Sequence, residues 1–178
     1  MAYSPWSVSF GEQPTADKWN MLGTNDASFN DGTGIGTNAV SAASLATNAI
    51  TLGYAEITSN FVTSSTTVTA LTGLSSAVTI PAGGRGIKIT MWAAQVTING
   101  AATCEVTIWD GTVGSGTQLA LGSTTISAAS LGAPIVVMAR KVPAAGAKTY
   151  NIGIKTSAGT ATVAAAATYP AFILVEAI

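Results

Sequence analysis

Glu105 and Asp110 are the closest candidates for a pair of catalytic carboxylates in the C-terminal part of the chain. A glycosidase needs two carboxyl groups that face each other across the sugar. An offset of five residues is odd, so the two side chains are expected on opposite faces of one strand. The 178 residues include no histidine, the commonest general base. Neither a Ser-His-Asp nor a Cys-His site is therefore possible in its familiar form, and we expect no enzyme activity.

The residues also give little support for a metal or cofactor site. Cys104 is the only cysteine, which excludes an intrachain disulfide framework and, without histidine, argues against zinc. Asn25–Gly32 (NDASFNDG) has the composition of a calcium loop. If Asp26 were its first ligand, however, Asp31 would stand at the glycine position and Thr37 at the glutamate position of an EF-hand. We interpret this stretch as an Asn/Asp-rich turn and expect no cofactor.

Trp92, Trp109 and Cys104 are the remaining side chains with possible chemistry. An exposed tryptophan can serve as a platform on which a sugar stacks. Aromatic side chains chiefly supply buried area, so packing in the core or in an interface is the favoured interpretation for both tryptophans. Cys104 is expected to fill core space as a small apolar side chain.

The composition indicates a protein that belongs to an assembly. Charged residues make up 8% of the chain, against about 25% in a typical protein. So little surface charge disfavours a free monomer, which stays soluble through its charge. The net charge of −1 gives no electrostatic case for nucleic acid. No run of about 18 apolar residues exists, so we expect no membrane insertion.

Residues 61–178 have the pattern of a β domain. Tyr150, Ile152 and Ile154 alternate with small or polar residues, and Gly, Pro and Ser turns separate several such runs. The alternation changes phase between Met91 and Val96, which predicts a β-bulge near Ala93–Gln95. The pattern predicts roughly eight to ten short strands and a jelly-roll-like antiparallel β-sandwich.

Residues 35–60 are predicted to form a thin shaft or neck. Large apolar residues recur every fifth position, and the motif Thr37–Val40 returns at Thr47–Ile50. This period fits neither an α-helix nor a β-strand. Three copies around a common axis could bury these side chains together, whereas one copy could not; the alternative is a flexible Ala/Ser-rich linker. The predicted axis residues are Ile35, Val40, Leu45 and Ile50.

Residues 1–34 are predicted to form an attachment segment. A short helix over Ala16–Leu22 could be capped by Thr15 and ended by Gly23. The segment holds more large apolar side chains than it can bury alone, so it must dock on another surface. No secretory signal is visible. The predicted attachment residues are Trp6, Phe10, Trp19, Leu22 and Phe29.

The stretch PTADKWNMLGTNDASFNDG resembles the "P-T-A-x-x-W-N-x-L-x-x-N-D" segments near the start of many fibre and minor structural proteins of tailed bacteriophages. Residues Phe61–Ile178 resemble the small jelly-roll heads that end such fibres. The resemblance implies a homotrimer, an N-terminal attachment region and a distal head that contacts the host. Because the shaft is short, a tail-tip appendage, a head fibre and a decoration protein all fit.

Three functions are therefore weighed. The first is a trimeric fibre or appendage of a phage particle, made in the host cytoplasm and anchored to other virion proteins, whose head can bind a host-surface glycan or protein. The second is a capsid decoration or cement protein. The third is a carbohydrate-binding module on a bacterial surface, against which the missing signal peptide counts.

Overall fold

The computed structural model describes residues 15–17, 20, 51–80, 85–129 and 131–178. The chain divides into two units, Met1–Ala49 and Ile50–Ile178. In the first unit Ala16, Asp17 and Asn20 are helical, which agrees with the predicted helix over Ala16–Leu22 at the positions described. The predicted axis and attachment residues lie outside the described residues: Trp6, Phe10, Trp19, Leu22, Phe29, Ile35, Val40, Leu45 and Ile50.

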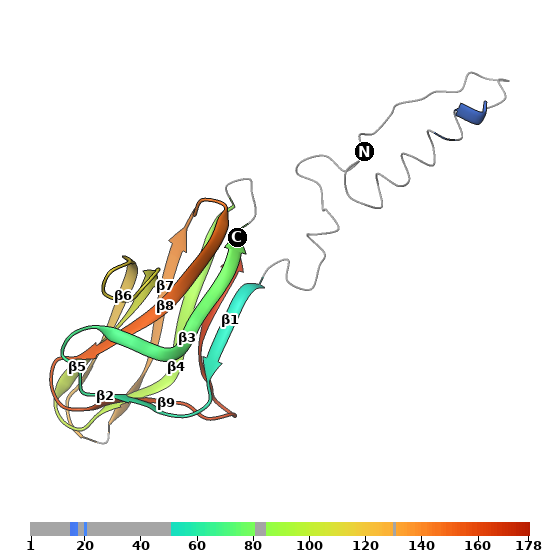
Figure 1. Cartoon of the computed structure of the whole chain (residues 1–178). Helices are drawn as coiled ribbons and strands as arrows, with labels where there is room; N and C mark the ends of the chain where they lie inside the picture. Colours follow the sequence, from blue (N-terminus) through green and yellow to red (C-terminus); the bar gives the residue numbers. More distant parts are fainter. Residues whose placement is uncertain (1–14, 18–19, 21–50, 81–84, 130) are drawn as a thin grey trace. The chain divides into compact units, whose positions relative to one another are not determined.

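The second unit consists of two antiparallel sheets (Figure 1). The six-stranded sheet contains β1 (Thr51–Ile57), β10 (Ala171–Ala177), β4 (Ile87–Ile98), β9 (Ala161–Ala164), β2 (Phe61–Thr63) and β7 (Gly132–Lys141). The four-stranded sheet contains β3 (Thr69–Ile80), β8 (Gly146–Thr156), β5 (Ala102–Asp110) and β6 (Thr117–Ile126).

The order of the longer strands makes this unit a jelly roll. Strands run β1-β10-β4-β7 in one sheet and β3-β8-β5-β6 in the other, so the chain crosses repeatedly between the sheets. Eight strands divided four and four in this way form the double Greek key of a jelly roll. The predicted all-β, jelly-roll-like sandwich is confirmed, and the short strands β2 and β9 bring the number of strands in this unit to the upper end of the predicted range.

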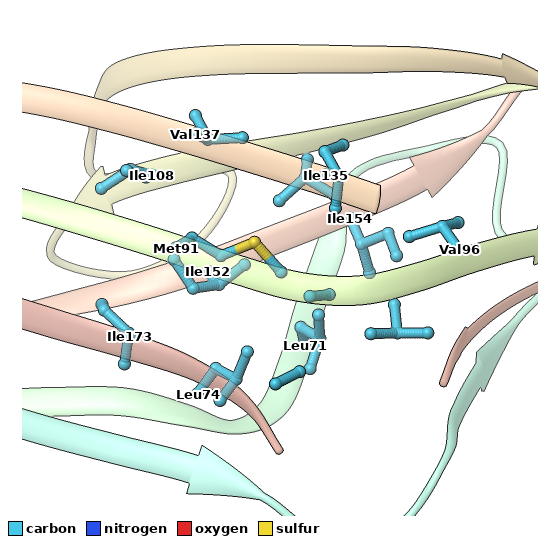
Figure 2. Packing of buried hydrophobic residues seen from close by; sticks show 14 of the residues in the cluster. Leu71, Leu74, Met91, Val96, Ile108, Ile135, Val137, Ile152, Ile154 and Ile173 are labelled. Atoms are coloured by element: carbon cyan, nitrogen blue, oxygen red, sulfur yellow. The ribbon is translucent and has the colours of Figure 1, made fainter. Parts of the chain in front are cut away.

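The core lies between the sheets and is built by alternation along each strand. Figure 2 shows aliphatic side chains of both sheets meeting there. From the six-stranded sheet these include Met91, Val96, Ile135, Val137 and Ile173; from the four-stranded sheet they include Leu71, Leu74, Ile108, Ile152 and Ile154. Each such side chain contributes about 1.5–3 kcal/mol on burial, so this core is the main contribution that offsets the conformational entropy lost on folding.

The predicted bulge in β4 is confirmed. Ile87, Ile89, Met91 and Ala93 point inward, and the pairing of β4 with β7 then shifts between Ala93 and Val96. The extra residue in β4 allows Val96 to point into the core again, although the spacing of the apolar residues in the sequence changes there. Cys104 is fully buried in the core, as expected of a small apolar side chain.

The structure corrects the predicted boundary at residue 61. The predicted shaft includes Thr51–Ile57. In the structure these residues form β1, which pairs with β10: Thr51 lies opposite Glu176, and Ile57 lies opposite Ala171. Leu52, Ala55 and Ile57 pack against the core. The partial burial of these side chains, together with the pairing of β1 with β10, explains why the segment joins the sheet. Of the segment predicted as shaft, residues 35–50 lie outside the described residues.

Candidate functional site

The outer surface of the six-stranded sheet carries a continuous group of large apolar side chains. Because successive strand residues point to opposite faces, the residues between the buried ones project outward from β1, β10, β4 and β7. We call this surface the aromatic face and define it as Tyr54, Trp92, Val136, Met138, Phe172 and Leu174.

Strand register brings these side chains together in two rows. Phe172 is paired with Trp92, and Trp92 with Val136. In the neighbouring row, Tyr54 is paired with Leu174, Leu174 with Thr90, and Thr90 with Met138. Side chains opposite each other on one face of an antiparallel sheet are direct neighbours. Four strands that are far apart in the sequence therefore build one surface.

Three aromatic rings lie side by side across this surface. The ring centroids of Phe172 and Trp92 are 5.6 Å apart with an interplanar angle of 26°, and the rings are stacked. The Tyr54 and Phe172 centroids are 5.7 Å apart with an angle of 35°. Such pairs each contribute about 0.5–1.5 kcal/mol beyond simple burial. Phe172 thus has an aromatic ring on either side.

The Tyr54 hydroxyl donates a hydrogen bond to the carboxylate of Glu56 on the same strand. This hydrogen bond, followed by desolvation and by the negative charge of Glu56, raises the pKa of Tyr54 to about 12. The hydroxyl therefore remains protonated at physiological pH. It holds Glu56 at the β1 edge of the aromatic face.

The aromatic face is open to solvent in the isolated chain. Met138 is 62% exposed, and Tyr54 and Val136 are each 50% exposed. Contiguous exposed apolar surface is uncommon on soluble monomers and marks a site of interaction. A surface of this kind can bind another apolar surface.

Charged groups border the aromatic face at its two edge strands. On the middle strands, Lys88 and Glu176 form an ion pair with 2.7 Å between Nζ and Oε2. Arg140 on β7 is paired across the strands with Lys88, and it takes part in no ion pair with any residue that the structure describes. The acidic Glu56 thus stands at one edge and the basic Arg140 at the other.

A second candidate site is a hollow of about 390 Å³ on the outer surface of the four-stranded sheet. It is lined by residues of β5, β6 and β8 and by the segment that precedes β3, among them Thr66, Glu105, Trp109, Gln118 and Lys155. Lys155 and Glu105, whose Nζ and Oε2 atoms form an ion pair 3.2 Å long, are both among its lining residues. This hollow offers polar side chains to a ligand.

Trp109 does not provide an open platform in this hollow. Its side chain is buried, and Nε1 donates a 2.7 Å hydrogen bond to the Thr107 hydroxyl. Gly153 on the adjacent strand lies so close that a Cβ there would stand 2.9 Å from Nε1. The favoured packing role is therefore confirmed for Trp109. Trp92, in contrast, is half-buried and belongs to the aromatic face.

The two carboxylates considered for catalysis point in different directions, as their odd offset predicted. Glu105 lies on the outer face of the four-stranded sheet with Lys155. Asp110 faces the other sheet and binds Lys141 at 2.6 Å. The described residues include no group of three or more potential metal-ligating side chains. In the same part of the chain, no helix is long and apolar enough to cross a membrane.

The aromatic face was not identified from the sequence, although Trp92 was singled out. The usable signal was the alternation of Tyr54 and Glu56 with Ala55 and Ile57, which marks a strand with one outward apolar side chain. The partners of Tyr54 on β10 and β7 require the strand order, which the sequence does not give.

The chain matches no protein-family model and none of the curated proteins. Solved structures resemble it at a distance. Eiger TNF from S. frugiperda is 10% identical, with 72% of this chain and 93% of that chain covered and a TM-score of 0.42. The carbohydrate-binding module CBM6cm-2 from Cellvibrio mixtus lichenase 5A is 14% identical, with 71% and 97% covered and a TM-score of 0.35. The enzymatically active domain of bacteriophage CBA120 tailspike protein 4 is 13% identical, with 72% and 19% covered and a TM-score of 0.30. These values are too low to support an argument about function, and the jelly-roll assignment rests on the strand order itself.

Proposed function

We propose that this chain is a structural protein of a bacteriophage virion: a homotrimeric short fibre or appendage, anchored through residues 1–34 and displaying the jelly-roll unit as its head. The observation that carries the proposal is the aromatic face, exposed on a chain in which only 8% of residues are charged. A surface of this kind needs a partner, and a protein built into a particle has one.

The N-terminal sequence supports attachment to other virion proteins. Its resemblance to the early segments of phage fibre proteins covers the stretch from Pro14 to Gly32, and its large apolar side chains need a surface on which to dock. In this proposal Trp6, Phe10, Trp19 and Leu22, together with Phe29, make that contact. The protein is made in the host cytoplasm and functions in the virion.

The head acts by binding and not by catalysis. Glu105 and Asp110 each have a lysine partner, and the two carboxylates lie on different faces of β5. They cannot face one substrate together, as a glycosidase requires. Contact with a host-surface glycan or protein is the role that remains for the head in an appendage of this kind.

The location of the chain in the particle tests the proposal. Electron microscopy of virions, with an antibody or tag against the jelly-roll unit, should place it on the tail or on an appendage. A regular lattice of label over the capsid would instead identify a decoration protein. Absence of the chain from purified virions would contradict both forms of the proposal.

Deletion of residues 1–34 tests the anchoring role. The ten strands of the residues that the structure describes all lie within residues 51–178, so the deletion removes none of these. We expect the shortened chain to fold and to be lost from the particle. Incorporation at normal occupancy would show that attachment lies elsewhere.

A carbohydrate-binding module is the second candidate, and the hollow over β5, β6 and β8 is the observation that favours it. Polar side chains there could hydrogen-bond a sugar. Titration of the full chain against a glycan panel, with Gln118→Ala as the comparison variant, distinguishes this candidate. Binding that is lost in Gln118→Ala would support a glycan site in the hollow.

A further inference from the structure

We propose that two adjoining hollows on the outer surface of the four-stranded sheet bind a linear, neutral oligosaccharide. The first hollow is the one over β5, β6 and β8. The second hollow has a volume of about 320 Å³, and its lining residues are Val68, Thr69, Ala70, Thr112, Val113 and Asn151. This inference rests on the glycan contact that the proposed function gives to the head, and it assigns that contact a surface and a class of glycan.

Strand register places the two hollows side by side. Asn151, which lines the second hollow, is paired with Trp109, and Trp109 is paired with Gln118; these last two line the first hollow. Residues paired across antiparallel strands project from the same face of a sheet. Two inter-strand steps of about 4.8 Å separate the strands of Asn151 and Gln118 by about 10 Å. One sugar ring is too small to contact both side chains, so the ligand that does so is a chain of linked sugars.

Val68 lines both hollows and gives them a shared apolar wall. A Cβ at Gly153 would lie 2.8 Å from Val68 Cγ2, and a Cβ at Gly114 would lie 4.0 Å from Val68 Cγ1. Glycine at position 153 therefore lets the segment before β3 lie close against β8. Leu121, which is half exposed, adds apolar surface to the first hollow. A sugar presents C–H groups as well as hydroxyls, and these C–H groups can pack against both side chains.

The charges of the two hollows favour a neutral ligand. Among the described residues that line them, only Glu105 and Lys155 are charged, and these two form an ion pair with each other. Their charges cancel, and a charged ligand would have to draw one partner away from the other. Both groups keep the capacity for further hydrogen bonds, because an ammonium group has three donors and a carboxylate about four acceptor sites. The pair can therefore bind uncharged hydroxyl groups.

The amide side chains favour a sugar over a peptide. Gln118 is exposed, and its amide offers both donors and an acceptor to hydroxyl groups. Asn151 Nδ2 donates a 2.8 Å hydrogen bond to the carbonyl of Gly111, which fixes the amide and directs its Oδ1 to act as an acceptor. An extended peptide is commonly bound by pairing with a strand edge. The backbone of β5 is already paired with β6 on one side and with β8 on the other, so the first hollow offers no such edge there.

Titration calorimetry of the 178-residue chain tests the inference. The probes are linear oligomers of α-linked glucose, β-linked glucose, mannose, galactose and N-acetylglucosamine, each from the monomer to the hexamer, at up to millimolar concentrations. We expect at least one series to bind, with the tetramer bound about tenfold more tightly than the monomer, because linked sugars occupy both hollows at once. No binding in any series, or an affinity that does not rise with chain length, would overturn the inference.

Two variants locate the bound oligosaccharide. Gln118→Ala removes an amide from the first hollow, and Thr69→Val removes a hydroxyl from the second without changing the shape of the side chain. Each should weaken binding of the tetramer by about threefold or more, as expected for one lost hydrogen bond. The control is Thr79→Val, because Thr79 is exposed on β3 and is not among the described lining residues of either hollow. Equal affinities of all three variants would place the ligand elsewhere and overturn the inference.

The outcomes separate this inference from the proposed function. A chain that is located on the tail or an appendage but binds none of the oligomers overturns the glycan site and leaves the virion protein intact. A chain that binds them but is absent from virions contradicts the virion protein and supports the carbohydrate-binding module. Sulfated forms of the same tetramers provide the test of charge. Tighter binding of a sulfated tetramer than of its neutral parent would contradict the neutral ligand.

Discussion

Lys141 and Asp110 join the two sheets of the jelly roll through an ion pair with 2.6 Å between Nζ and Oδ2. Lys141 ends β7 in one sheet and Asp110 ends β5 in the other. Asp110 is paired across the strands with Tyr150, whose buried hydroxyl has no hydrogen-bond partner among the described residues. Desolvation, and then the charge of Asp110, raises the pKa of Tyr150 to about 12. The ion pair therefore neutralises a carboxylate at the margin of an apolar core.

Lys141→Met should destabilise the jelly roll by about 1–3 kcal/mol, because it leaves the partly buried Asp110 carboxylate without its charged donor. The measurement is chemical unfolding of the full chain, followed by tryptophan fluorescence. Lys148→Met is the matched control, since Lys148 takes part in no ion pair of the described residues. That control should change stability by less than about 0.5 kcal/mol. Equal effects of both variants would show that the Asp110 contact is not stabilising.

Cys104 should not react with thiol reagents while the protein is folded. Burial, followed by the charge of Glu105, raises the pKa of this thiol to about 11. Only the thiolate is nucleophilic, so the folded protein holds almost none of the reactive form at pH 8. In the unfolded chain the pKa returns to about 8.5. A disulfide reagent should label Cys104 in urea and not in buffer; rapid labelling of the native protein would contradict its place in the core.

Gly153→Ala should destabilise the four-stranded sheet. A Cβ at this position would lie 2.6 Å from Thr107 Oγ1 and 2.8 Å from Val68 Cγ2. Overpacking of this kind costs about 1–3 kcal/mol. Gly100→Ala is the control, because a Cβ there has no neighbour within 4 Å. Thermal unfolding of the two variants should separate them clearly, and equal melting temperatures would contradict the close packing at Gly153.

The core could be predicted from the sequence because local alternation determines it. The inward residues of β4, the bulge after Ala93 and the burial of Cys104 all follow from the phase of the apolar pattern. β1 could not be separated from the neck, because Tyr54, Ala55 and Glu56 continue an Ala-rich segment whose period suggested another structure. The aromatic face depends on which strands are neighbours, and no local pattern in Trp92 or Phe172 reveals that.

The residues of the predicted axis are tested by substitution at Leu45. If the five-residue period marks a three-fold axis, Leu45→Asp would place three carboxylates in an apolar environment, where an unpaired charge is very costly. The trimer should dissociate while the jelly roll keeps its fold. Ser44→Asp, one position away, should have little effect. Should both variants assemble equally well, residues 35–50 act only as a linker.

The native mass of the 178-residue chain tests the central claim most directly. Analytical ultracentrifugation at micromolar concentrations should give a single species of three times the 17.7 kDa chain mass. In the proposed trimer the apolar side chains of the neck sequence would be buried between copies, so trimers should persist on dilution. A stable monomer throughout this range would contradict the trimeric appendage.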